Sequence, residues 1–159
     1  MAGRRKGWSV AAAGVLVLGM VGAAASASGS SSMSSPSTLQ FQAHTEREAS
    51  IDLGRAGRSL GDEQVLAGLL YDRTGATRVG TFRAVCVVTS RSPVKGECSM
   101  TARVAGKGQI TSQGYSQIPL VGFTNGVTGG TGIFQNTRGQ VSGKSVTPAI
   151  TDLEYQVLP

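Results

Sequence analysis

Residues 78–105 read RVGTFRAVCVVTSRSPVKGECSMTARVA and contain two runs typical of β-strands. Residues 78–89 are rich in Val and Thr, whose branched side chains favour a pleated, half-buried surface. Ser90, Arg91, Ser92 and Pro93 interrupt this run, and residues 96–105 follow as a second one. The stretch therefore predicts a β-hairpin.

Two cysteines, Cys86 and Cys98, lie on the two arms of this hairpin. If they face each other, Val88 faces Gly96 and Thr89 faces Lys95. Directly opposed residues at a non-hydrogen-bonded position lie about 4.5 Å apart at Cα, which a disulfide tolerates. We predict a disulfide in an exported protein, with two buried thiols as the alternative. We predict no metal site, because the chain has one His and no further Cys.

Further short runs of the same kind extend outward in both directions, separated by turn residues and without a helical stripe. In residues 38–45, Leu39, Phe41 and Ala43 alternate with polar residues, which predicts a half-buried strand. Such spacing predicts an all-β domain: an eight-stranded antiparallel barrel, with a sandwich as the alternative. An eight-stranded barrel is nearly filled by its own side chains or holds one small ligand. The expected strands are 38–45, 64–71, 78–89, 96–105, 109–117, 120–125, 139–146 and 151–158.

The charge balance does not predict a nucleic-acid surface. The chain has 159 residues, with 15 Lys and Arg against 9 Asp and Glu. Three of the basic residues, Arg4, Arg5 and Lys6, lie in a leader, and the others are scattered without interleaved aromatics. We expect a solvated basic surface and no nucleic-acid partner.

The first 27 residues have the pattern of a bacterial-type signal peptide. Arg4, Arg5 and Lys6 precede an apolar run at 10–21, and Ala25 and Ala27 provide the small residues before a cleavage site. The run is shorter than the ~20 residues that span a bilayer, so we predict a secreted protein without a membrane anchor. The paired arginines leave twin-arginine export open. We divide the chain into a signal peptide (1–27), a Ser-rich flexible linker (28–37) and a barrel domain (38–159).

The glycine-rich segment 126–132, GVTGGTG, is predicted to form a tight connection between two strands. With its surroundings, VTGGTGIF at 127–134 followed by RGQV at 138–141, it resembles the allene oxide cyclase and dirigent barrel superfamily. Members carry a GGTGxF or GGSGxF turn followed by an xxGxV strand. The segments SLGD at 59–62, LLYD at 69–72 and GQITSQG at 108–114 agree in the same order. The resemblance covers about residues 53–146.

Bacterial allene-oxide-cyclase-like proteins, among them barrels that perform [4+2] cycloadditions, are the closest in pattern. The resemblance implies a barrel without a cofactor, which binds one small hydrophobic molecule and steers its cyclisation or isomerisation; the signal peptide adds that it is secreted. The acidic residue of dirigent strands corresponds here to Ala67 or Gly68. This departure favours the alternative of a non-catalytic binding module.

Candidate site residues are polar or aromatic side chains on the predicted strands. Glu46 and Glu48 share a predicted strand face with His44 and stand near the acidic N-terminal strand of allene oxide cyclases. For each candidate, a position on the outer surface is the alternative. The catalytic candidates are Glu46, Glu48 and Tyr115, and the ligand-binding candidates are Tyr71, Arg83, Arg103, Gln113 and Phe123.

Three functions follow: a cyclase or isomerase, a ligand-binding or dirigent-like module, and a structural secreted barrel with a filled core. An internal cavity of about 300 Å³ or more would support the first two. Each of these functions is compatible with a homo-oligomer.

Overall fold

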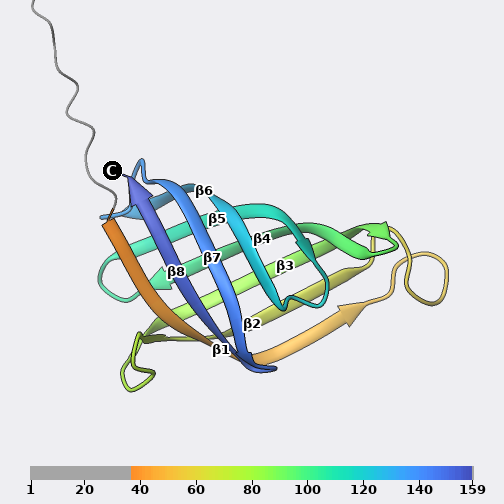
Figure 1. Cartoon of the computed structure of the whole chain (residues 1–159), viewed down its shortest axis with the longest axis horizontal. Coiled ribbons are helices and arrows are strands. Elements are labelled where there is room, and N and C mark those ends of the chain that lie inside the picture. Colours follow the sequence, from red (N-terminus) through yellow and green to blue (C-terminus); the bar gives the residue numbers. More distant parts are fainter. Residues whose placement is uncertain (1–36, 159) are drawn as a thin grey trace, which may run out of the picture. The chain divides into compact units, whose positions relative to one another are not determined.

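The computed structural model describes residues 37–158, and every regular element in this part is a strand (Figure 1). No helix within it is long and apolar enough to cross a membrane. The predicted signal peptide and the linker up to residue 36 lie outside the described residues. The strands are β1 (Ser37–Ile51), β2 (Glu63–Asp72), β3 (Arg78–Arg91), β4 (Val94–Val104), β5 (Gly108–Gln117), β6 (Gly122–Gly132), β7 (Arg138–Thr147) and β8 (Ile150–Leu158).

Each strand pairs with the next along the chain, and β8 returns to pair with β1, which closes the barrel. All pairings are antiparallel. The predicted all-β, eight-stranded antiparallel barrel is confirmed, and the sandwich is excluded. The order follows from the short connections, because antiparallel neighbours can be joined by tight turns.

Two apolar clusters fill the barrel. The larger includes the fully buried Leu70, Ile110, Val141 and Tyr155. Leu39 and Phe41 pack against it and Ala43 belongs to it, so this part of β1 is half-buried as predicted, with its apolar face inward. The smaller cluster consists of Cys86, Val88, Cys98 and Ile118, with Val94 and Leu120 packed against it.

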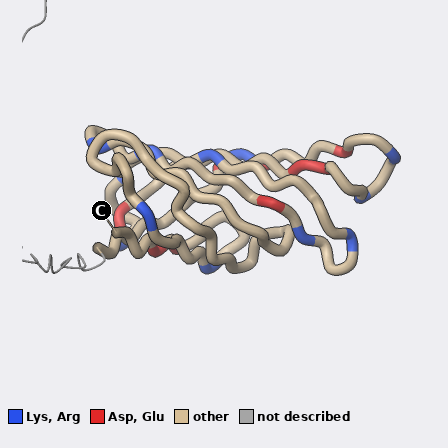
Figure 2. The backbone as a smooth tube through the Cα atoms, turned by 90° about the horizontal axis from the view of Figure 1, so that it is seen from above, with Lys and Arg blue, Asp and Glu red and all other residues tan. Residues whose placement is uncertain are grey.

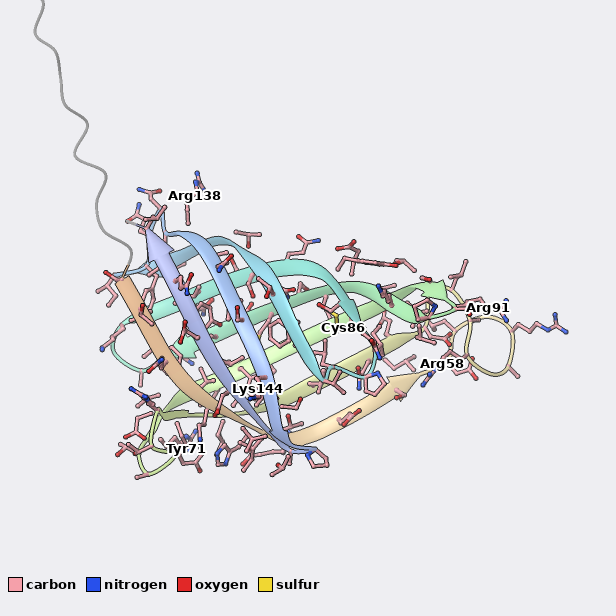
Figure 3. The ribbon with its side chains drawn as sticks, viewed as in Figure 1. Arg58, Tyr71, Cys86, Arg91, Arg138 and Lys144 are labelled. Carbon is pink, nitrogen blue, oxygen red and sulfur yellow. A yellow bond between two sulfur atoms is a disulfide. The ribbon has the colours of Figure 1, made fainter. Side chains whose placement is uncertain are left out.

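The disulfide between Cys86 and Cys98 is confirmed, with a Cα–Cα distance of 4.0 Å; Figure 3 shows Cys86 on its strand. Val88 faces Gly96 as predicted, but Ser90, not Thr89, faces Lys95. The predicted register fails there because one extra residue enters β3 between Val88 and Ser90. Pairing then continues to Arg91 and Val94, immediately beside the turn.

The prediction that the glycine-rich segment connects two strands is wrong. The segment is part of β6, and the chain turns after it. Backbone oxygens of Gln109 and Phe134 lie 2.5 and 2.6 Å from where a Cβ on Gly130 would be. Glycine therefore lets this strand lie against two neighbouring backbone segments. Gly132 ends the strand at a φ of 65°, a left-handed conformation that glycine adopts readily.

A β-bulge at Glu46 divides β1 into two parts. Thr45 faces Gly68 and Arg47 faces Ala67 on β2, so Glu46 is the extra residue. Up to His44, β1 pairs with both β8 and β2. From Arg47 onward it pairs with β2 alone. Figure 1 shows β1 turning sharply part-way along its length, as expected where a bulge bends a strand. The barrel opens at this end, which we call the mouth.

Candidate functional site at the open end of the barrel

The interior cavity of the barrel has a volume of ≈ 100 Å³. Apolar side chains from β2, β3, β4 and β6 form most of its wall, and polar groups gather toward the mouth. Small residues such as Ala43 and Ala84 leave this space unfilled. The apolar lining includes Leu66, Phe82, Met100, Phe123 and Leu153, and the polar lining includes Thr45, Glu48, Gln64, Asn125, Ser145 and Thr151.

A second cavity, of ≈ 430 Å³, lies at the mouth and adjoins the first. Glu48, Gln64 and Pro119 line both. The interior cavity by itself does not reach the volume of about 300 Å³ that was expected of a ligand-binding barrel, so it has room for only one end of such a ligand. The mouth cavity provides room for the remainder.

Glu48 and Gln64 are hydrogen-bonded to each other where the two cavities meet. The Nε2 group of Gln64 donates to Oε1 of Glu48 at 2.6 Å. Gln64 is only 7% exposed, and its Oε1 is buried without a hydrogen-bond partner. Buried polar groups are nearly always paired, so this oxygen is a free acceptor on a residue that lines both cavities.

A second polar pair lies deeper in the barrel. The hydroxyl of Ser116 donates to Oδ1 of Asn125 at 3.3 Å, and both residues are buried. Asn125 lines the interior cavity. Together with Glu48 and Gln64, it gives a partly apolar space a few fixed polar groups, the usual composition of a small-molecule site.

Solved structures with the same barrel include three proteins named for small-molecule chemistry. Pyocyanin demethylase matches with a TM-score of 0.67 at 24% identity, over 76% of this chain and 99% of that one. The exo-specific intermolecular Diels-Alderase AbnU matches with a TM-score of 0.61 at 13% identity, over 77% and 98%.

A pterocarpan synthase dirigent protein matches with a TM-score of 0.58 at 15% identity, over 77% of this chain and 82% of that one. The chain has the dirigent-like barrel fold. The resemblance drawn from the glycine-rich segment is confirmed at the level of the fold. No protein-family model and no curated protein sequence matches the chain.

Two of the predicted site residues, Glu48 and Phe123, line the interior cavity of this dirigent-like barrel. The predicted common face of Glu46, Glu48 and His44 is wrong, because the bulge lies between them. Glu48 faces Leu66 and the interior, whereas Glu46 lines a cavity on the outer face with Arg47 and Arg83.

The other candidates lie on the outer surface. Tyr71 stacks on His44, with ring centroids 4.4 Å apart. Tyr115 is 52% exposed, and Nζ of Lys95 lies 5.7 Å from its ring centroid. Arg83 donates to the carbonyl of Phe82 at 2.7 Å. Gln113 and Arg103 are also exposed, so none of these residues lines the interior cavity.

Sequence reasoning missed Gln64 and Asn125. In β2, Leu66 and Leu70 face inward, while Val65 and Leu69 face the partly covered outer side. Both sides of this strand are apolar, so alternation does not reveal that Gln64 points inward. Asn125 is the last residue of the predicted strand 120–125 and precedes the predicted connection. The sequence therefore does not show which side of the strand its side chain faces.

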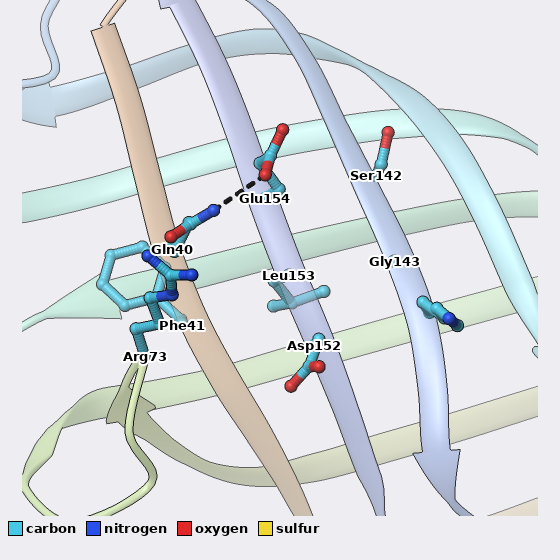
Figure 4. A pocket seen from close by; sticks show the side chains of 9 residues that line it. Gln40, Phe41, Arg73, Ser142, Gly143, Asp152, Leu153 and Glu154 are labelled. Atoms are coloured by element: carbon cyan, nitrogen blue, oxygen red, sulfur yellow. Dashed lines mark hydrogen bonds between the residues drawn. The ribbon is translucent and has the colours of Figure 1, made fainter.

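A groove of ≈ 420 Å³ on the outer wall lies over β1, β7 and β8 (Figure 4). Nε2 of Gln40 donates to Glu154 at 2.8 Å there, and Arg73, Lys144 and Asp152 add mixed charge. The groove is therefore a solvated surface of both signs. Lys and Arg are spread along the whole barrel (Figure 2), without the single basic face of a nucleic-acid protein. Within residues 37–158, no group of three or more His, Cys, Asp and Glu is placed to hold a metal.

Proposed function

We propose that the chain is a secreted, cofactor-free barrel that binds one small hydrophobic molecule at its mouth and steers its cyclisation or isomerisation. The observation that carries this proposal is the Glu48–Gln64 pair, which places an unpaired acceptor beside an apolar cavity. The names of two proteins with this fold, a Diels-Alderase and a pterocarpan synthase dirigent protein, support ring-forming chemistry, whereas pyocyanin demethylase supports only an action on a small molecule.

The barrel would act mainly by restricting the shape of its ligand. One end enters the ≈ 100 Å³ interior and the rest lies in the mouth cavity. Holding a flexible molecule in a near-attack conformer removes entropy from the barrier and selects one stereochemical outcome. The wall that fixes the ligand is formed by Leu66, Phe82 and Phe123.

Glu48 is the residue that would contribute acid–base or electrostatic chemistry. Its carboxylate is exposed to the mouth and is oriented by Gln64. A carboxylate in this place can take a proton from the ligand or stabilise positive charge that develops in the transition state. A ligand-binding module without catalysis would use the same contact only to orient its ligand.

The first experiment is native mass spectrometry of the protein purified from its own culture medium without denaturant. We expect a bound small molecule whose mass narrows the substrate class. The supernatant also tests export, because a protein retained in the cell would contradict the signal-peptide prediction. An empty barrel that ignores a panel of hydrophobic dyes and polyenes would favour the structural barrel instead.

Catalysis is tested with the ligand so identified. Glu48→Gln keeps the hydrogen-bonding shape and removes the charge. An enzyme is expected to lose ~10²–10⁴-fold in turnover with this change, with ligand still bound. Equal product formation with and without the wild-type protein would identify a binding module.

A further inference from the structure

We propose that the mouth selects ligands that carry a protonated amine at the end bound by Glu48 and Gln64, attached to a flat apolar body. This inference rests on the proposed function and names its ligand class. It combines three observations: two acceptors on neighbouring, hydrogen-bonded residues, an excess of carboxylates in the lining of the mouth cavity, and an apolar wall beside them.

The hydrogen-bond geometry requires a donor from the ligand. Because Nε2 of Gln64 is engaged by Glu48, the amide orientation is fixed and Oε1 must be the acceptor. That oxygen is buried and has no partner, in a side chain that is 93% buried and lines both cavities. The Glu48 carboxylate can accept further hydrogen bonds. An ammonium group has three donors and no acceptor, so it can satisfy both residues at once.

The charge around the mouth favours a cation over a neutral donor. The mouth cavity is lined by four carboxylates, Glu48, Asp52, Asp62 and Glu63, against one guanidinium, that of Arg58. In the chain without the leader residues Arg4, Arg5 and Lys6, basic residues still outnumber acidic ones, by 12 to 9. The net charge of the residues that line the mouth cavity is therefore negative, whereas that of the protein as a whole is positive. A cleft lined by one sign of charge concentrates ligands of the opposite sign.

Two of the carboxylates at the mouth hold a loop in place, and Glu48 is available to contact a ligand. Asp52 accepts from the amide of Gly57 at 2.9 Å, and Asp62 accepts from the amide of Ser59 at 2.6 Å. These two therefore hold the loop between β1 and β2 and contribute charge at a distance. Glu48 is paired only with a side chain of the cavity wall and stays available for direct contact.

The wall behind the acceptors accommodates the apolar part of the ligand. Leu66, Phe82 and Phe123 line the interior cavity, and Gln64 lies two residues before Leu66 on the same inward face of β2. A ring placed against these side chains leaves an attached CH₂–NH₃⁺ group near Gln64. A carboxylate at the same place would meet two acceptors and four like charges.

The test uses three probes with one ring system and different heads: 1-naphthylmethylamine, 1-naphthalenemethanol and 1-naphthoate. Binding to the full chain is measured by calorimetry near pH 7. We expect the amine to bind at least about tenfold more tightly than the alcohol, and the naphthoate most weakly. Glu48→Gln and Gln64→Met should each reduce the preference for the amine to less than about threefold.

Two carboxylates outside the mouth provide matched controls. Glu46→Gln changes the carboxylate on the other side of the bulge, and Glu154→Gln changes one in the outer groove. Both should leave the preference intact. If Glu154→Gln removes it and Glu48→Gln does not, the amine binds the outer groove and the inference is overturned.

The remaining outcomes separate this inference from the proposed function. Equal binding of all three probes, lost on Phe123→Ala, would overturn charge selection and leave a ligand-binding barrel. No binding of any probe, together with an empty barrel in native mass spectrometry, would overturn both.

Discussion

The ring of Phe123 occupies the space that a side chain at position 143 would fill. The two residues face each other directly across β6 and β7, and a Cβ built on Gly143 would overlap the Phe123 ring. The ring thus lies against bare backbone on the cavity wall, an aromatic–glycine pair of the kind that stabilises sheets. Its place beside the cavity depends on the absence of a side chain at Gly143.

Gly143→Ala should therefore displace the Phe123 ring. We expect a loss of ~1–3 kcal/mol in the free energy of unfolding, typical of overpacking, and weaker binding of aromatic probes. Denaturant unfolding and calorimetry measure the two effects. Gly126→Ala is the control, because its nearest atom, a backbone oxygen of Gln113, would lie 3.8 Å from the new Cβ. If the clash is the cause, Gly143→Ala will cost less in a Phe123→Leu background.

Tyr155→Phe should maintain or increase the stability of the barrel. Tyr155 is fully buried, and its hydroxyl has no hydrogen-bond partner. Burial also raises the pKa of the Tyr155 phenol above its ordinary value. Removing an unpaired buried hydroxyl spares a desolvation penalty of ~1–3 kcal/mol. Tyr115→Phe on the outer surface is the matched control, expected within ~0.5 kcal/mol of wild type. A loss of more than ~1 kcal/mol for Tyr155→Phe would show that water pairs the hydroxyl.

Loss of the disulfide should destabilise the barrel. The bond joins residues 12 positions apart, and closing a loop of this size stabilises by ~2–3 kcal/mol in the chain-entropy model. We expect dithiothreitol to lower the Tm of the wild type and to leave that of Cys86→Ala/Cys98→Ala unchanged. The intact mass of the native protein should lie two hydrogens below the reduced mass. An unchanged wild-type Tm after verified reduction would contradict the prediction.

The loop at the mouth should lose order in acid at an unusually low pH. Hydrogen bonds from the backbone amides of Ser59 and Leu53 lower the pKa of Asp62 below its ordinary value. Because the pKa of Asp62 is lower in the folded than in the unfolded protein, the stability that its carboxylate contributes is fully present above about pH 4, the pKa of the unfolded state. It is lost as the pH falls through the lower pKa of the folded protein.

Nuclear magnetic resonance can follow the amide signals of Leu53 and Ser59 from pH 6 to pH 2. In the wild type they should titrate with a midpoint below that of an ordinary Asp, and Asp62→Asn should abolish this step. Glu97→Gln, on the exposed face of β4, should not affect it. A midpoint at or above the ordinary value would mean that these hydrogen bonds do not form in solution.

Much of the barrel could be predicted from local sequence. The hairpin around Ser92 and Pro93 follows from two β-branched runs and a turn, and the two cysteines then face each other because of strand register. The half-buried strand at residues 38–45 also follows, since Leu39, Phe41 and Ala43 alternate with polar residues. The glycine-rich segment identified the fold correctly but was misplaced as a turn, because glycine serves both turns and close backbone packing.

The site depended on two features that local sequence does not reveal. The strand period is two, so the single extra residue at Glu46 turns Glu48 to the interior and leaves Glu46 outside. β2 is apolar on both faces, so only the closed barrel shows that Gln64 points inward. Sequence thus determined that eight strands form and that the two strands carrying Cys86 and Cys98 pair. The tertiary structure decided which polar groups meet inside, because a bulge and closure of the barrel set the side that each residue faces.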